Sequence, residues 1–477
     1  MLDGLEITEL SLEDILKDNQ HLRIDSEYFK KEFINFYLNV PNIDLLGSFV
    51  EEGYRVVYEN TKILNKEEAI SKNFPIFLQA TDLQTPFIKK DNFYYVDEKD
   101  WVRYPMGRIK SGELLIEVKG KIEKVAIVSN DFPEKVLVSG SLYKMTVRDT
   151  INKYYLLVYL ISKYGSAFKD RSKTNLLIPF LSKDDLFNIP IPIFSNLFQT
   201  LIETLIKNAN IYSEESQKVY KAAETLLLTE LDLQDFKPTE GNTSVRTIED
   251  SFLSSWRLDA EYYQPKYDEL EKKCRENALY VKIVKDIRTF NRRGLQPNYA
   301  ENGDLDIINS RHILATMLDY GNFEKTNYKN WKTQVIAQVQ YGDILTYTTG
   351  ANIGRTHTYL SNENALASNH VNILRIENEN AVYVAFVINS IVGQYQTEKL
   401  SAGSAQQELY PKDIDRFYIP FIKEEYQTMI EDKVIESRLK NLESKRLLNL
   451  AKTAVEIAIE ENEEMAIQYI QKETDLR

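Results

Sequence analysis

The sequence FQTLIETLIKNANIYSEESQKVYKAAETLLLTE (residues 198–230) returns 228 positions later as YQTMIEDKVIESRLKNLESKRLLNLAKTAVEIA (residues 426–458). Neither copy contains Gly or Pro, the two residues that most disfavour a helix interior, so each predicts one long helix. Identical residues keep the same offset along the stretch, including Gln199-Thr200 with Gln427-Thr428 and Glu215-Ser216 with Glu443-Ser444. A long helix repeated at fixed register indicates a duplicated unit.

The first copy carries apolar residues at the four-three spacing of a helix that packs along another helix. They are Phe198, Ile202, Leu205, Ala209, Tyr212, Val219, Ala223 and Leu226, with Ser216 as a polar exception. The second copy is less regular, with Ile435, Leu439, Leu442, Leu447, Ala451 and Ala454. One interpretation is two unrelated surface helices, each on its own domain. The fixed register favours another, in which the helices pair with each other, antiparallel, or with matching helices of a partner.

Composition limits the class of protein. The 477 residues suit two or three domains, and Cys274, the single cysteine, rules out a disulfide framework and suits a reducing cytoplasm. The acidic first residues show no signal peptide, and no apolar run is long enough for a membrane span. The net charge of −13 argues against a freestanding nucleic-acid binder. It leaves room for a DNA reader with local basic patches that works inside a complex.

The duplication extends upstream of the helices. RIDSEYF (23–29) returns as RLDAEYY (257–263), and GELL (112–115) returns as GDIL (342–345). The offset drifts from 234 to 228 and then stays constant through the helix, as expected if insertions gather in loops. Strands are predicted at 114–118 with 125–128 and at 343–346 with 371–376, and helices at 154–164 and 382–394. Each half ends on an Ile-Pro strand, IPIPIF (189–194) or YIPFI (418–422).

These patterns predict an α+β (mixed α/β) protein with an internal pseudo-twofold repeat, in which long helices pair as an antiparallel coiled coil. The expected order is domain 1 (1–195), long helix 1 (196–235), linker (236–250), domain 2 (251–422), long helix 2 (423–465) and a tail (466–477).

With these residues in view, the chain resembles the specificity (S) subunits of type I restriction–modification systems over nearly its whole length. The matching strings are RIDSEYF and RLDAEYY, GELLIEVKG followed by VAIV, GDILTYTTGANIG, and SAGSAQQELYPKDIDRFYIPFI (401–422). Each string alone is weak, but their order, repeated twice with a helix after each, is specific. The first unit departs from the pattern, with KDRSKTNLLIPF where the second has its Gly-Ser-Ala-Gln-Gln loop.

The resemblance implies two target-recognition domains that each read half of a split site in double-stranded DNA. It also implies docking of two methyltransferase (M) subunits, one per repeat, and with them the restriction (R) subunits. S-adenosylmethionine for N6-adenine methylation would bind the M subunits, and ATP and Mg²⁺ would be used in the partner subunits. This chain itself is then expected to be non-catalytic, without cofactor or metal, and cytoplasmic.

Candidate DNA contacts in the first unit are clustered cations, which can neutralise phosphates, interleaved with short polar residues that can reach bases. They are Lys163, Lys169, Arg171, Lys173, Thr174 and Asn175. The alternative is the solvated end of a helix.

Candidates in the second unit lie in three segments: the basic pair Arg292 and Arg293, a turn after a predicted strand, and a polar loop. The turn offers Tyr347, Thr348, Asn352 and Arg355, and the loop offers Ser401, Ser404, Gln406 and Gln407. Gln can bond an adenine edge bidentately in the major groove. The alternative for the loop is a plain surface turn.

A rival from another class is a Mg²⁺-dependent nuclease. Glu117 and Lys119 on a predicted strand, with Asp100 upstream, have the residue types such a site needs. The equivalent positions of the second unit are Tyr347 and Thr349, which cannot hold a metal, so the duplication argues against this alternative. A helical scaffold without a DNA role is a third possibility.

Overall fold

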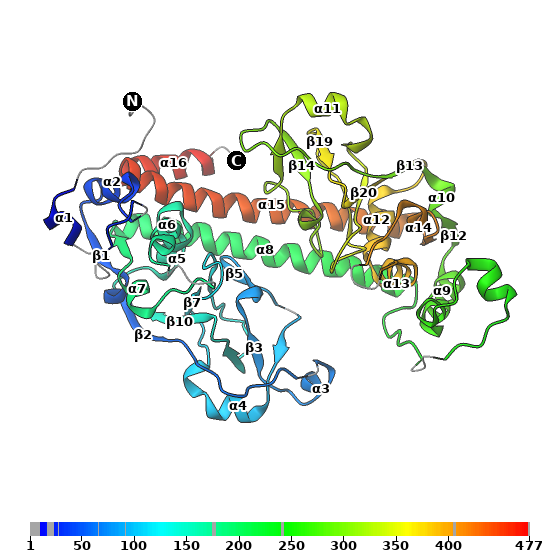
Figure 1. Cartoon of the computed structure of the whole chain (residues 1–477), viewed down its shortest axis with the longest axis horizontal. Helices are drawn as coiled ribbons and strands as arrows, with labels where there is room; N and C mark the ends of the chain where they lie inside the picture. Colours follow the sequence, from blue (N-terminus) through cyan, green and yellow to red (C-terminus); the bar gives the residue numbers. More distant parts are fainter. Residues whose placement is uncertain are drawn as a thin grey trace. The chain divides into compact units, whose positions relative to one another are not determined.

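The computed structural model describes residues 10–16, 23–26, 28–64, 66–90, 92–173, 178–239, 243–403 and 407–475. It is a mixed helix and strand protein, as predicted (Figure 1). Two compact units make up the chain: unit 1 is Met1–Ile211 with Glu443–Arg477, and unit 2 is Tyr212–Leu442. The sequence assigned each long helix to a spacer of its own, whereas these units divide each long helix between them. Among the described residues, none of the helices is both long and apolar enough to cross a membrane.

Unit 1 is built on a four-stranded antiparallel sheet in the order β2-β10-β7-β8, formed by β2 (Val50–Tyr54), β7 (Leu114–Glu117), β8 (Val125–Ile127) and β10 (Leu142–Val147). A second sheet, β6-β3-β9, joins β3 (Ile76–Leu78), β6 (Tyr94–Tyr95) and β9 (Val136–Val138), and two ribbons pair β1 (Ile43–Leu45) with β11 (Pro190–Pro192) and β4 (Leu83–Gln84) with β5 (Phe87–Ile88). The helices are α1 (Leu12–Leu16), α2 (Lys31–Asn39), α3 (Lys66–Ser71), α4 (Glu98–Arg103), α5 (Lys153–Ile161), α6 (Lys163–Arg171), α7 (Lys183–Phe187) and α16 (Glu463–Asp475).

Unit 2 repeats this plan. Its main sheet, β13-β20-β17-β18, contains β13 (Arg288–Arg293), β17 (Ile344–Tyr347), β18 (Thr356–Thr358) and β20 (Val371–Ile376). The second sheet, β15-β14-β19-β16, contains β14 (Leu305–Ile308), β15 (Glu324–Thr326), β16 (Gln338–Val339) and β19 (Ala365–Ala367), and β12 (Tyr280–Ile283) pairs with β21 (Tyr418–Phe421). The helices are α9 (Pro265–Asn277), α10 (Val284–Ile287), α11 (Lys329–Thr333), α12 (Ala381–Asn389), α13 (Ile391–Leu400) and α14 (Pro411–Ile414).

The predicted strand pairs are confirmed: β7 pairs with β8, and β17 with β20, both antiparallel. The two predicted helices each divide into two. Residues 154–164 fall in α5 and α6, separated at Ser162, and residues 382–394 fall in α12 and α13, separated at Ser390. Both serines leave the helical conformation and cap the second helix through their hydroxyls. The apolar pattern continues across the break, which explains why a single helix was predicted.

The two units also share individual hydrogen bonds at the 228-residue offset. The amide of Asn152 donates to Glu203, and that of Asn380 donates to Glu431. The hydroxyl of Tyr155 donates to the carbonyl of Pro192 at 2.8 Å, and its counterpart from Tyr383 reaches Pro420 at 2.6 Å. Repetition of these hydrogen bonds, and not only of the chain trace, shows that the duplicated sequence folds into a duplicated structure.

The two long helices are α8 (Asn196–Glu230) and α15 (Glu424–Glu460). Within unit 1, the hydroxyl of Ser444 donates to the carbonyl of Ala209 at 2.6 Å. Within unit 2, Ser216 and Ser437 each donate to the carbonyl of the other, at 2.7 and 2.8 Å. Residue numbers therefore increase along α8, from 209 to 216, while those of the partners decrease along α15, from 444 to 437. The two helices are an antiparallel pair, as predicted.

The seam of this pair agrees with the predicted one in α8 and differs from it in α15. One heptad position runs through Ile202, Ala209, Ser216 and Ala223 in α8, and through Ile430, Ser437, Ser444, Ala451 and Ala458 in α15, all of them buried. Leu439, predicted in the seam, is 55% exposed. Small residues let the backbones approach until a serine hydroxyl reaches the facing carbonyl. The second long helix ends at Glu460 and not at 465, because Asn462 caps a separate helix, α16.

Candidate nucleic-acid interface

In unit 2 the polar loop after α13 is hydrogen-bonded to the turn that joins β17 to β18. The amide of Leu409 donates to the carbonyl of Thr348 at 2.9 Å, and the amide of Gly350 donates to the carbonyl of Gln407 at 3.1 Å. Two segments that lie about 60 residues apart in sequence therefore form one surface.

Arg293, at the end of β13, joins the same surface. Its Nη2 donates to the carbonyl of Leu409 at 3.0 Å, and its guanidinium lies 4.7 Å from the ring centre of Tyr410. Nη1 lies 3.6 Å from a carboxylate oxygen of Glu408. The three sequence segments that supplied the unit 2 candidates thus meet in one place.

Unit 1 has the same frame, with different side chains on it. The amide of Leu181 donates to the carbonyl of Val118 at 2.9 Å, and the amide of Gly120 donates to the carbonyl of Pro179 at 3.1 Å. Lys119 forms the bridge with Phe180 that Thr349 forms with Glu408. Arg55, which follows β2, lies with its guanidinium 4.9 Å from the ring centre of Phe180. We call these two surfaces the loop-on-hairpin frames, 118–120 with 179–181 and 348–350 with 407–409.

The cations predicted in unit 1 have protein partners. Lys163 pairs with Glu460 of α15, and its amide donates to Glu456 at 2.8 Å. Arg171 stacks on Tyr28 at 3.7 Å, so the entry motif packs on the end of α6. Lys173 donates to the carbonyl of Lys121 at 2.7 Å. Thr174 and Asn175 lie outside the described residues. Lys163, Arg171 and Lys173 are therefore each held by a contact within unit 1.

Lys169 is buried inside unit 1, so we withdraw it as a phosphate contact. Its side chain is 0% exposed, and its Nζ donates to the carbonyl of Glu123 at 3.3 Å, under the β7–β8 turn. Burial lowers the pKa of this amine to about 8, because the charged form is poorly solvated there. The sequence could not separate it from its exposed neighbours because all lie in one basic cluster.

Lys169→Met should therefore leave DNA affinity and its salt dependence unchanged. A folded-state pKa below the unfolded value means that the unfolded chain binds more protons between about pH 8 and 10.4, so wild-type stability gains a contribution as pH rises through that range. Methionine removes this contribution and fills similar space. Thermal unfolding of both proteins at pH 7.5 and 10 would show a smaller difference in the variant. A reduced salt slope of DNA binding would instead return Lys169 to the interface.

In unit 2, Thr348 and Ser401 are also buried. The Thr348 hydroxyl donates to the carbonyl of His370 at 3.0 Å, and Ser401 ends α13, so neither side chain is presented to a ligand. The remaining candidates form two groups. Arg292, Asn352 and Gln407 are exposed, and Tyr347 and Arg355 are half-buried. Ser404 and Gln406 lie outside the described residues.

Two of the residues predicted for a nuclease site, Glu117 and Asp100, make hydrogen bonds within unit 1. The Glu117 carboxylate is 8% exposed and accepts the amides of Glu123 at 3.1 Å and Lys124 at 3.3 Å. Asp100 lies on α4, where it accepts the hydroxyl of Thr61 at 3.2 Å. Among the described residues, the acidic, His and Cys side chains form no group of three that could hold a metal. The geometry gives Glu117 a turn-stabilising role.

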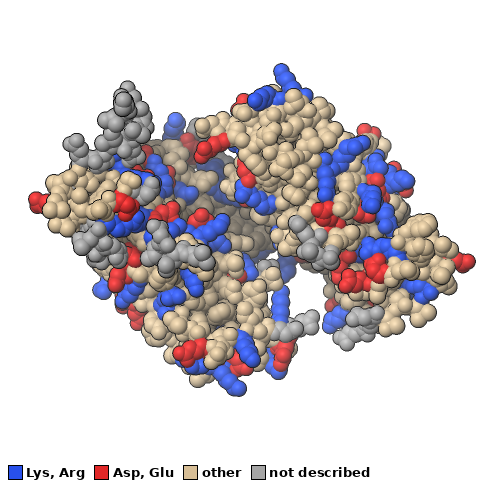
Figure 2. Space-filling model, viewed as in Figure 1, with Lys and Arg blue, Asp and Glu red and all other residues tan. Residues whose placement is uncertain are grey.

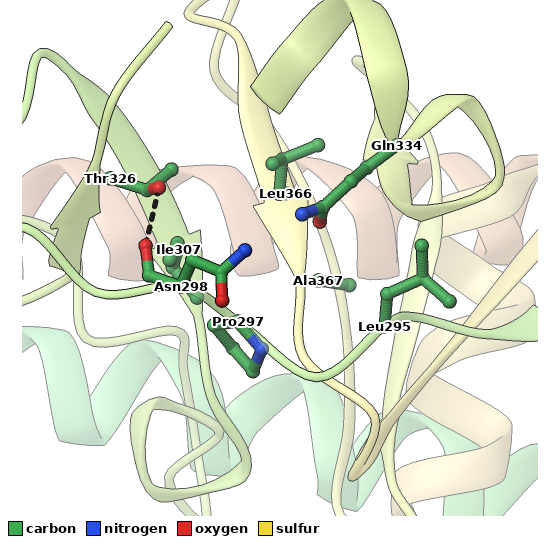
Figure 3. A pocket seen from close by; sticks show the side chains of 8 residues that line it. All are labelled: Leu295, Pro297, Asn298, Ile307, Thr326, Gln334, Leu366 and Ala367. Atoms are coloured by element: carbon green, nitrogen blue, oxygen red, sulfur yellow. Dashed lines mark hydrogen bonds between the residues drawn. The ribbon is translucent and has the colours of Figure 1, made fainter. Parts of the chain in front are cut away.

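The surface in view carries charges of both signs, and unit 2 contains a small apolar space. Figure 2 shows Lys and Arg interleaved with Asp and Glu on the face in view, in keeping with the acidic composition. Figure 3 shows a small space in unit 2, lined mainly by apolar side chains such as Leu295, Ile307 and Leu366. The hydroxyl of Thr326 there donates to the carbonyl of Asn298 at 2.6 Å. This space is too tight to admit a water molecule and provides no ligand site.

Sequence reasoning missed Phe180, Glu408 and Tyr410. Phe180 and Glu408 differ by 228 positions, the offset of the helices, so aligning the two repeats at that offset would have paired them. An isolated Phe or Glu carries no signal of its own.

No family model and no curated protein matches the sequence. Among solved structures, the S subunit of a type I restriction–modification system from M. genitalium matches with a TM-score of 0.43 at 12% identity, over 88% of this chain and 96% of that chain. The HsdS subunit from Thermoanaerobacter tengcongensis matches with a TM-score of 0.27 at 12% identity, over 88% and 97%. The chain is similar in structure to type I specificity subunits. A further chain, from a study of complex assembly and conformational transition in a type I system, matches with a TM-score of 0.28 at 12% identity, over 89% and 99%.

Proposed function

We propose that this chain is the DNA-specificity subunit of a type I restriction–modification complex, in which each unit reads half of a bipartite site. The observation that carries the proposal is the loop-on-hairpin frame, which occurs once per unit with the same main-chain hydrogen bonds and different side chains. A repeated scaffold with divergent side chains is what two readers of unlike half-sites require, since side chains on base edges carry sequence information.

In this proposal the chain recognises DNA and its partners perform the chemistry. Two M subunits, one per repeat, would bind S-adenosylmethionine and methylate adenine, and R subunits would use ATP and Mg²⁺. The order of motifs in the sequence supports this assignment. The net charge of −13 is compatible with it, because partner subunits can supply phosphate-facing cations.

Exchange of one unit tests the proposal. We expect that replacing residues 25–192 with the corresponding segment of a related protein changes only one half of the methylated motif, because the frame of unit 1 is built within that segment. Long-read mapping of modified adenines in cells that express the complex would show this. Exchange of the segment for an identical-sequence copy recloned in the same way is the control. Changes in both halves would contradict independent readers, and the absence of any methylated motif in the control would contradict the function itself.

A further inference from the structure

Glu408 and Phe180 occupy equivalent places in the two frames. Each forms an antiparallel bridge with the β-turn residue opposite it, Thr349 for Glu408 and Lys119 for Phe180. Each is followed by a buried leucine whose amide is bonded to the hairpin. The backbone therefore presents these two side chains in the same way.

The backbone of Glu408 is fixed on both sides. Its amide donates to the carbonyl of Ala402 at 2.8 Å, and the amide of Ala402 donates back to Glu408 at 2.9 Å. On the other side, the bonds from Leu409 to Thr348 and from Gly350 to Gln407 hold the strand to the hairpin. A side chain on a segment held from both sides starts from a defined position, which sequence discrimination needs.

The Glu408 side chain is 32% exposed, and its carboxylate stays ionised. A hydrogen bond with Tyr410 and the nearby Arg293 lower its pKa. A carboxylate beside DNA phosphates is repelled unless a cation offsets it, and Arg293 is such a cation. An ionised carboxylate has several acceptor positions, so the bond with Tyr410 leaves acceptor capacity for a ligand.

Phe180 has an apolar ring in the equivalent place. It is half-buried, with Arg55 on its ring, and Lys119 beside it is exposed. An arginine thus lies beside the equivalent position in each unit: Arg55 contacts the ring of Phe180, and Arg293 lies beside the carboxylate of Glu408.

We propose that position 408 and its equivalent, position 180, are base-reading positions: Glu408 accepts a hydrogen bond from the N4 amino group of cytosine, and Phe180 packs on the methyl group of thymine. These are the major-groove groups that a carboxylate and an apolar side chain recognise. The inference rests on the proposed function and assigns a substrate feature to each reader.

The test is selection of bound sequences from a library of randomised DNA duplexes, with the full-length chain in complex with its M subunits at about 0.1 M salt. Wild type should enrich a two-part motif. Glu408→Ala should reduce cytosine preference at one position of one half by roughly 5- to 150-fold. Glu408→Gln should admit adenine at that position, because an amide bonds the adenine edge. Phe180→Glu should replace thymine by cytosine in the other half. Glu301→Ala, which removes an exposed carboxylate elsewhere in unit 2, is the matched control.

The outcomes separate the two claims. If wild type enriches a motif that Glu408→Ala and Glu408→Gln leave unchanged, Glu408 only holds Arg293 and Tyr410, and the inference is overturned while the function stands. If wild type enriches no motif, the proposed function and the inference fall together. Equal melting temperatures of wild type and the Gln variant would show that an altered motif does not come from unfolding.

Discussion

Gly393→Ala should prevent unit 2 from folding. A Cβ at this position would lie 2.0 Å from the carbonyl oxygen of Ile388 and 2.4 Å from its carbonyl carbon, and both atoms are backbone. Contacts below 3.0 Å cannot be relieved by rotating a side chain, so α12 and α13 would have to separate at Ser390. We expect the free energy of unfolding to fall by more than about 3 kcal/mol, which would appear as a large fall in melting temperature or as insoluble expression.

Gly47→Ala is the matched control, because the nearest atom to its new methyl group is a Phe187 side-chain carbon at 3.1 Å, which can move. Gly165→Ala should repeat the effect in unit 1, since its Cβ would lie 2.1 Å from the carbonyl oxygen of Tyr159. A Gly393→Ala protein that unfolds like wild type would mean that the break between the two helices is looser than described.

Lengthening both long helices should lengthen the spacer between the half-sites. The contacts of Ala209 with Ser444 and of Ser216 with Ser437 place the matched insertion points after Tyr212 and after Lys440. Four residues in each helix add about 6 Å. With about 3.4 Å per base pair, the spacer of the methylated motif should grow by roughly one or two base pairs. Both half-sites should stay the same, because the insertion touches neither frame.

The control is insertion of the same four residues into α8 alone. This insertion moves Ser216 out of register with Ser437 and should therefore abolish DNA methylation. Methylome sequencing reads both results. An active double insertion with an unchanged spacer would show that the helices only dock partners and that spacing is fixed elsewhere.

The sequence by itself determined the repeat, the long helices and the strand pairs of the main sheets. These features depend on hydrophobic periodicity and on similar residues that return at a nearly constant offset. The three segments that supplied the unit 2 candidates also meet in the structure, since Arg293 and the turn at 347–350 contact the loop at 407–409. Apolar periodicity misjudged the seam of the second long helix, however. Ser216 looked like an exception, whereas Ser437 and Ser444 occupy the same buried position, so size and not polarity defines the contact.

Only the tertiary structure decided which members of a cluster reach the surface. Lys169 and Lys173 are near neighbours in one basic stretch, but the fold places the first beneath the β7–β8 turn and leaves the second on its edge. The equivalent positions of Phe180 and Glu408 arise from main-chain hydrogen bonds between segments far apart in sequence. Burial and such long-range pairing depend on packing between distant parts of the chain. Local residue patterns therefore do not predict them.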